Sequence, residues 1–304
     1  MPAGRLMLLD TPSLYFRAFF GVPESVKATD GTPVNAVRGL LDMIARLVSE
    51  RRPERLVCCF DADWRPEFRV AAIPSYKAHR VAAQTPEGSV EETPDTLLPQ
   101  LPVIDAVLDA LGLARAAVPG YEADDVIGTL ATRDAGPVDV VTGDRDLFQL
   151  VDAARDVRIL YTAKGIRNLE VFGEQEVAAK YGIPGRAYAD FAILRGDPSD
   201  GLPGVPGIGE KTAAALISRF GSLAGVLEAL DAGITEGFPA GSRKRLEAGR
   251  AYLGPAELVC RVAEDLPIEV DDALPPVPRD PAELESLATR WNLASPVKRL
   301  LSVL

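Results

Sequence analysis

The chain has 304 residues, of which 47% are hydrophobic and 25% charged, a composition typical of a globular protein with a sizeable buried core. Its N-terminal apolar run, RLMLLD, is too short to cross a bilayer, and no signal-peptide pattern is present, so we expect no membrane association. The three cysteines are odd in number, and two are adjacent. This argues against a disulfide framework or a zinc site and predicts a reduced, cytoplasmic protein.

The net charge of −11 does not by itself favour a nucleic-acid partner. Nine of the 44 acidic residues, however, are candidate metal ligands for the reasons given below. The other 35 nearly balance the 33 basic residues, so the overall charge neither excludes DNA nor supports it. A DNA-binding surface on this chain would need local basic patches and metal ions.

The first two thirds of the chain alternate between predicted strands and predicted helices. Short apolar runs predict buried strands at residues 5–10, 55–60, 138–142 and 157–161. Helical spacing of apolar residues predicts helices over residues 34–49, 102–112 and 122–133, and a last helix over 281–292. The alternation predicts an α/β fold with a mostly parallel sheet flanked by helices. Ligands of such sheets bind beyond the carboxyl ends of the strands, and three of the four runs end in or beside an Asp.

Three segments interrupt or follow this pattern. Residues 63–99 are rich in Pro, Ala and polar residues, and a long insertion without periodicity is usually functional or disordered. Beyond residue 180 the pattern changes to helices with short Gly/Pro turns, and after residue 262 it changes again to a Pro-rich acidic stretch. We therefore expect a core over 1–180, a helical subdomain over 181–262, and a C-terminal extension over 263–304 that packs on the core.

Acidic residues gather at strand ends, helix starts and Gly-flanked turns. Singly, each has an ordinary structural explanation, because Asp caps helices and acids in a first helical turn favour the helix dipole by roughly 0.3–1 kcal/mol. As a group they are harder to explain, because EADD (122–125) packs three charges into four residues, and GDRD and GDPSD add two each. Like charges this close repel one another, and burial would raise their pKa values. The group consists of Asp10, Asp61, Glu122, Asp124, Asp125, Asp144, Asp146, Asp197 and Asp200.

Divalent cations would relieve this repulsion. Carboxylate oxygens are the hard ligands that Mg²⁺ and Mn²⁺ prefer, and nine carboxylates are too many for one octahedral ion. Two ions roughly 3.5–4 Å apart can activate a water and stabilise the leaving oxygen of a phosphodiester. Zinc is not expected, because the sole histidine is His79.

A glycine-rich loop at 204–212, GVPGIGEKT, invites comparison with a nucleotide-binding P-loop. The P-loop requires Gly-Lys-Ser/Thr in succession, but Glu210 separates Gly209 from Lys211, and no strand precedes the loop. A hairpin between two helices fits better, with Gly207 and Gly209 allowing a phosphate to approach and the next helix start attracting anions. A plain helix-connecting turn is the alternative.

Six segments, taken together and in order, resemble the bacterial 5′-nucleases of the flap-endonuclease superfamily, including the 5′→3′ exonuclease domain of DNA polymerase I. They are LLDTPSLYFRAFF (8–20), FDADWRPEFR (60–69), YKAHR (76–80), VPGYEADDVIGTLA (118–131), VVTGDRDLFQLV (140–151) and LRGDPSDGLPGVPGIGEKTAAALI (194–217). The resemblance implies a PIN-like nuclease core, a helical arch over about 64–99 and a helix–hairpin–helix (H3TH) subdomain. No polymerase follows, so the chain is expected to act as a stand-alone protein.

The resemblance also assigns roles to the residues that match the family's motifs. One metal ion would mainly be served by Asp10, Asp61, Glu122, Asp124 and Asp125. The second would mainly be served by Asp144, Asp146, Asp197 and Asp200. At the arch base, Lys77 would contact the scissile phosphate, Arg80 would grip a phosphate and Tyr76 would stack on a base. Without the motif, a solvated basic turn would be the preferred explanation of these residues.

Further matching residues are expected to bind DNA. Tyr15, Arg17 and Arg69 belong to the first two segments. The hairpin residues Gly207, Gly209, Lys211 and Thr212 would grip the backbone of duplex DNA, often with a monovalent cation such as K⁺, and would read no sequence because phosphates carry none.

The implied function is a structure-specific 5′-nuclease, both 5′→3′ exonuclease and flap endonuclease, that uses two or more Mg²⁺ or Mn²⁺ ions in DNA replication and repair. Its partners would be DNA with 5′ flaps, gaps or free 5′ ends. The protein is expected to be a monomer, and a polymerase or ligase partner is not visible in the sequence. The alternatives are a non-catalytic binder of branched DNA and a metal-dependent phosphatase for small phosphoesters.

The sequence departs from the family pattern in two places. The arch segment is longer than usual and carries four acids, Glu87, Glu91, Glu92 and Asp95. Gly201 stands where relatives often have Asn.

Overall fold

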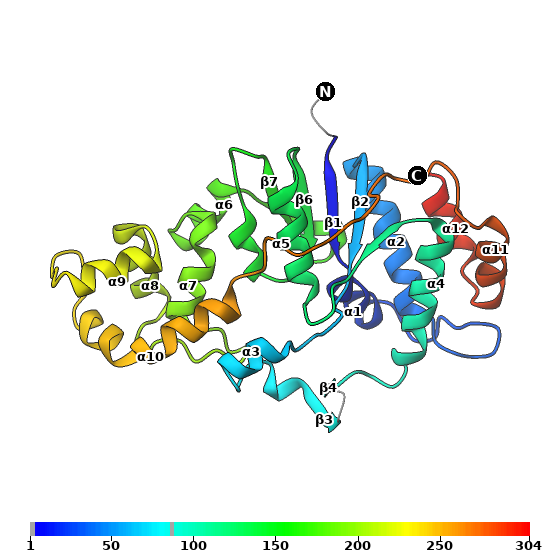
Figure 1. Cartoon of the computed structure of the whole chain (residues 1–304). Coiled ribbons are helices and arrows are strands. Elements are labelled where there is room, and N and C mark those ends of the chain that lie inside the picture. Colours follow the sequence, from blue (N-terminus) through cyan, green and yellow to red (C-terminus); the bar gives the residue numbers. More distant parts are fainter. Residues whose placement is uncertain (1–3, 86–87) are drawn as a thin grey trace.

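The computed structural model describes residues 4–85 and 88–304, so the arch acid Glu87 lies outside the described residues. A six-stranded sheet with helices on both faces forms the centre of the molecule (Figure 1). Its strands are β1 (Leu6–Asp10), β2 (Arg55–Cys59), β5 (Ala114–Ala116), β6 (Val138–Thr142), β7 (Val157–Tyr161) and β8 (Glu170–Phe172). They lie in the order β5-β2-β1-β6-β7-β8, and all neighbours are parallel except β7 and β8. The mostly parallel α/β sheet expected from the sequence is confirmed.

The central strand β1 is apolar from Leu6 to Leu9 because both faces of the sheet are covered. In β1, Leu6 and Leu8 face one apolar cluster, whereas Met7 and Leu9 face the other. The second cluster includes residues of α1 (Thr11–Gly21), α2 (Asn35–Arg51) and α4 (Leu101–Leu111). The first includes residues of α5 (Ala123–Arg133), α6 (Glu174–Tyr181) and α7 (Tyr188–Arg195).

The first cluster continues without a break into α8 (Glu210–Phe220), α9 (Leu223–Asp231) and α10 (Ser242–Cys260). At the other end of the molecule, α11 (Pro281–Arg290) and α12 (Ala294–Leu301) pack against α4 and α2 (Figure 1). Arg299 of α12 also pairs with Asp42 of α2 at 2.6 Å. Among the described helices, no single one is long and apolar enough to cross a membrane, and one bent pair, α8 with α9, reaches that length and composition.

The segment expected to form a helical arch takes a different form. It begins with the short helix α3 (Glu67–Ala72), makes a 3₁₀ turn at Ala78–Arg80, and continues as an antiparallel ribbon of β3 (Val81–Thr85) and β4 (Gly88–Glu91). The expectation of a helical arch is therefore wrong for the described residues of this segment. Pro74 and Pro94 lack the N–H that a helix interior needs, and Gly88, at φ +132°, has a backbone conformation that no helix contains.

Candidate active site: a carboxylate cavity at the carboxyl end of the sheet

A cavity of about 230 Å³ opens where the central strands end. Asp10 is the last residue of β1, and Asp61 and Asp144 each follow their strand, β2 or β6, by two residues. Carboxyl ends of neighbouring parallel strands meet at one edge of the sheet, which is why these three acids converge. Five of the nine predicted ligands line the cavity, namely Asp10, Asp61, Glu122, Asp124 and Asp144.

Asp10 shows that a helix cap and a site residue can be the same side chain. It is the N-cap of α1, because its Oδ1 accepts a hydrogen bond from the amide of Ser13 at 3.2 Å. Its Oδ2 accepts a second hydrogen bond from the Thr142 hydroxyl at 2.6 Å. Asp10 is only 5% exposed, and this burial, with the charge of Asp144, raises its pKa to about 6. The cavity therefore holds its carboxylates in an environment that opposes their negative charge.

Asp146, Asp197 and Asp200 do not line the cavity but lie close enough to interact with Asp144 or with one another. Burial, followed by the charges of Asp144, Asp200 and Asp197, raises the pKa of Asp146 well above its usual range. Its Oδ1 is buried and makes no hydrogen bond with any residue that the structure describes. A buried carboxylate oxygen without a donor is costly, and a cation would satisfy it.

The donor set fits a hard divalent cation. Every cavity acid offers carboxylate oxygens, which suit Mg²⁺ or Mn²⁺, and Asp146 adds a buried carboxylate oxygen that has no hydrogen-bond partner among the described residues. Within residues 4–85 and 88–304, no three acidic, histidine or cysteine side chains are already drawn together as a closed ligand set. Mg²⁺ keeps several waters and is usually bound directly by only one or two carboxylates.

Glu122 is the cavity acid with positively charged partners. One of its oxygens pairs with the ammonium of Lys77, and the other accepts hydrogen bonds from Arg69 and, at 2.7 Å, from the hydroxyl of Tyr76. Burial alone would raise the pKa of Glu122, but the charges of Lys77 and Arg69 hold it below the usual value. Lys77 thus brings a cation into the acidic cavity, as a phosphate-binding role requires.

Tyr76 does not fit the expected stacking on a base. Its side chain is buried in the apolar core, with 4% of the residue exposed, and its hydroxyl is used by Glu122. A nucleotide base could not reach the ring face without displacing that packing. In this structure the Tyr76 hydroxyl instead donates a hydrogen bond to Glu122 from within the apolar core.

Asp125 and Arg69 also depart from their expected roles. Asp125 is 0% exposed, and its oxygens accept hydrogen bonds from Arg69 at 2.7 and 2.9 Å and from the amides of Glu122 and Ala263 at 3.1 and 2.9 Å. Arg69 is 3% exposed, so it is not available to DNA. Asp125 is the third residue of α5 and closes a capping box with Glu122, which turns it away from the cavity. The pair is better described as a buried ion pair that joins α3 to α5.

The remaining predicted contacts lie around the cavity mouth. Arg80 lines the cavity and donates to the Ser199 carbonyl at 3.0 Å and to Asp200 Oδ1 at 3.3 Å. Arg17 donates to the Ala163 carbonyl at 3.5 Å, beside the loop after β6. Tyr15 is half-buried against Phe16, with ring centroids 5.1 Å apart.

Several residues that line the cavity carried no predicted role, among them Phe16, Trp64 and the ribbon acid Glu91. Trp64 donates to the Ser89 carbonyl at 2.9 Å and so ties β4 to the cavity wall. Trp64 lies in the same motif as Asp61, which is the only signal in the sequence that could have indicated it.

The predicted DNA hairpin lies between α7 and α8. Gly207 has a φ of +81°, and Gly209 is the N-cap of α8. Lys211 is exposed and Thr212 is half-buried, both on the first turn of that helix. The helix start and one lysine therefore face solvent together, an arrangement that attracts anions.

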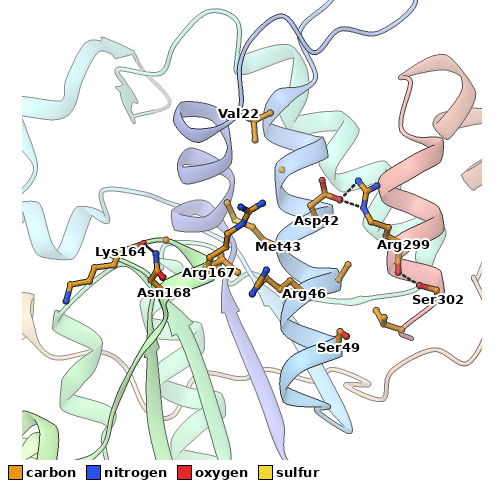
Figure 2. Close-up of a pocket in the computed structure, with 15 residues that line it drawn as sticks. Val22, Asp42, Met43, Arg46, Ser49, Lys164, Arg167, Asn168, Arg299 and Ser302 are labelled. Carbon is orange, nitrogen blue, oxygen red and sulfur yellow. Dashed lines mark hydrogen bonds and ion pairs between the residues drawn. The ribbon is translucent and has the colours of Figure 1, made fainter.

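A larger cavity, about 730 Å³, lies elsewhere, between α2, α12 and the loop after β7 (Figure 2). Its charged lining is mostly basic, and its one acid, Asp42, is paired with Arg299 at 2.6 Å. Carboxylate chemistry therefore belongs to the smaller cavity.

Two family models match the chain in succession. The model described as 5′-3′ exonuclease, N-terminal resolvase-like domain, matches residues 5–182, and the one described as 5′-3′ exonuclease, C-terminal SAM fold, matches residues 183–280. A protein of Streptomyces coelicolor named 5′-3′ exonuclease is 63% identical over 300 residues, which is 98% of this chain and 99% of that protein. DNA polymerase I of Mycobacterium bovis is 45% identical over 231 residues, which is 75% of this chain and 24% of the polymerase.

The fold also resembles a solved structure, the T5 D15 protein co-crystallised with metal ions. The two share a TM-score of 0.65 at 17% identity, over 98% of this chain and 99% of the other. At that identity the likeness concerns the fold alone. The two family models and the Streptomyces relative, by contrast, cover nearly the whole chain, and on that ground the chain belongs to the 5′-3′ exonuclease family.

Proposed function

We propose that this 5′-nuclease hydrolyses DNA phosphodiesters with two divalent metal ions, Mg²⁺ or Mn²⁺, at 5′ flaps, gaps and free 5′ ends. The observation that carries the proposal is a cavity lined by five carboxylates and by Lys77, whose ammonium pairs with Glu122. An acidic site needs cations to accept a phosphate, and a lysine within it marks where the phosphate would lie.

The residues in and around the cavity would bind either metal ions or phosphates. Asp10, Asp61, Glu122 and Asp124 would hold the first ion and its waters, and Asp144, Asp146, Asp197 and Asp200 would hold the second. Bound ions of this kind supply an activated water and charge for the leaving oxygen. Lys77 would exchange Glu122 for a substrate phosphate, and Arg80 would hold a neighbouring phosphate at the cavity mouth.

Duplex DNA would be held by the hairpin at residues 204–212, within the helical subdomain 181–262. Gly207, Gly209, Lys211 and Thr212 present the start of α8 to solvent, where a phosphate, with or without K⁺, would be bound without sequence preference. Tyr15 and Arg17 would contact the strand near the cavity. The three cysteines are free and buried, which supports a reducing, cytoplasmic setting, and we expect a monomer.

The test uses a 5′-flap duplex labelled at both ends of the flap strand, incubated with Mg²⁺, Mn²⁺ or EDTA. We expect metal-dependent cutting near the junction, and the ratio of single nucleotides to longer products would measure the balance of exonuclease and endonuclease action. Binding without cutting in either metal would instead favour a non-catalytic binder of branched DNA. Turnover of a small phosphoester but not of DNA would favour a phosphatase.

A further inference from the structure

Two segments far apart in the sequence meet beside the cavity: residues 75–80, at the base of the ribbon, and the loop 197–202. The Ser75 hydroxyl donates to the Gly201 carbonyl at 2.7 Å. The Lys77 amide donates to the Asp200 carbonyl at 2.9 Å. The backbone of a residue assigned to the scissile phosphate is therefore fastened to the backbone of a residue assigned to the second ion.

Gly201 is what allows this approach. Its φ is +72°, and a Cβ at this position would lie 2.1 Å from the Ser75 carbonyl oxygen. Asn tolerates a positive φ, but its Cβ would meet the same backbone oxygen, which cannot swing aside as a flexible side chain can. The contact therefore requires a glycine at position 201.

The loop 197–202 and the ribbon base around Lys77 are each held in place, so neither can move away from the other without breaking other contacts. The loop is closed by reciprocal backbone hydrogen bonds between Asp197 and Leu202, at 3.0 and 2.8 Å. Lys77 has φ +46° and ψ 20°, a left-handed conformation that is uncommon outside glycine and persists only where the surroundings hold it. The hydrogen bond from its amide to Asp200 is one of the contacts that hold it.

We propose that Ser75 and Gly201 are positioning residues that join the ribbon base to the acidic loop and thereby fix Lys77 relative to Asp200. Neither is assigned to substrate or metal; each acts through its neighbour. The inference rests on the proposed function, because Lys77 and Asp200 matter only if the cavity is the active site. Loosening the joint should misplace these two residues while leaving the duplex-binding hairpin intact.

The main test is Gly201→Ala, with Gly233→Ala as its matched control. Gly233 also has a positive φ, +71°, but a Cβ there would meet nothing within 4 Å, so the control carries the same backbone strain without the contact. With a flap duplex in Mg²⁺, Gly201→Ala should lower kcat by about 10-fold to 100-fold, as misplacements of about 1 Å do. KM should change little, and Mn²⁺ binding to the free protein, measured by calorimetry, should weaken. Gly233→Ala should leave all three unchanged.

Variants of Ser75 provide a second, independent test. Ser75→Ala should lower kcat by a smaller factor, Ser75→Thr should restore it by keeping the hydroxyl, and the effects of Ser75→Ala and Gly201→Ala should not add in the double variant. Thermal unfolding would confirm that each variant folds. A folded Gly201→Ala protein with the wild-type kcat and the wild-type Mn²⁺ affinity would overturn the proposal that this contact positions Lys77 and Asp200. If the wild-type chain cuts no DNA, the proposed function fails instead. The positioning role of Ser75 and Gly201 is then tested only by comparing Mn²⁺ binding of the wild-type and Gly201→Ala proteins.

Discussion

At the scale of single residues, hydrogen bonding distinguishes carboxylates that are free to bind a metal from those that hold the fold together. Asp146 belongs to the first kind, because its buried Oδ1 has no hydrogen-bond partner among the described residues. We expect Asp146→Asn to lower the cleavage rate by more than the roughly 10–100-fold typical of residues that only support a ligand. The affinity for DNA in EDTA should be nearly unchanged, because Asp146 is not one of the hairpin residues proposed to hold duplex DNA. Single-turnover cleavage and filter binding would measure the two. Asp231→Asn, which removes an exposed carboxylate of the same size on α9, is the control and should cut normally.

Asp125 should behave in the opposite way. Because both oxygens of Asp125 are used by Arg69 and by backbone amides, Asp125→Asn would weaken a fully buried ion pair. The free energy of unfolding should fall by roughly 1–3 kcal/mol, because Arg69 keeps Glu122 as a charged partner and loses the charge of only one of its two carboxylates. Urea unfolding would measure it. A protein of unchanged stability that no longer cuts DNA would restore a direct metal role for Asp125.

Single side chains were also where the sequence was least informative. EADD shows that three acids are adjacent, but not that α5 begins at Ala123 and turns Asp125 away from Asp124 by about 100° per residue. Nor could the pattern show that Tyr76 and Arg69 are buried, since this depends on how α3 packs on α5 and α10. The strand-end acids were easier to predict because β-sheet topology alone brings Asp10, Asp61 and Asp144 to one edge.

At the scale of elements, long apolar runs were predictable and short strands were not. Residues 5–10, 55–60, 138–142 and 157–161 correspond closely to β1, β2, β6 and β7. The edge strands β5 and β8 have three residues each, too few to show any period. The β3–β4 ribbon was missed for a related reason: its strands are short and exposed, so burial imposes no hydrophobic pattern on them.

The start of α8 carries the exposed lysine Lys211, which we expect to contact one DNA phosphate. Lys211→Ala should weaken duplex binding about equally for every DNA sequence and should lower the slope of log K against log salt concentration by about 1, the loss of one phosphate contact. Binding isotherms at several salt concentrations, in Ca²⁺ to limit cleavage, would measure this. Lys298→Ala, on exposed α12 at the far end of the molecule, is the control. Equal effects of the two variants would point to general electrostatics and not to a hairpin contact.

At the scale of the whole molecule, the charge of −11 is not evenly spread, because a group of its carboxylates is crowded at one edge of the sheet. In the metal-free protein these carboxylates repel one another, and burial opposes their ionisation. This region therefore lowers the stability of the folded protein. A cation that binds only the folded chain should therefore act on stability as well as on catalysis.

We accordingly expect Mg²⁺ or Mn²⁺ to raise the Tm, by an amount that grows with metal concentration. At 100 times the dissociation constant, one bound ion contributes about 2.7 kcal/mol to the free energy of unfolding. Scanning calorimetry with and without EDTA would measure the shift, and NaCl at matched ionic strength separates binding from screening. In the double variant Asp144→Asn/Asp146→Asn, the metal-free Tm should not fall, because two mutually repelling charges are gone, and most of the metal-dependent rise should disappear. If NaCl reproduces the shift, or if the double variant keeps it in full, the ions are not bound at this cavity.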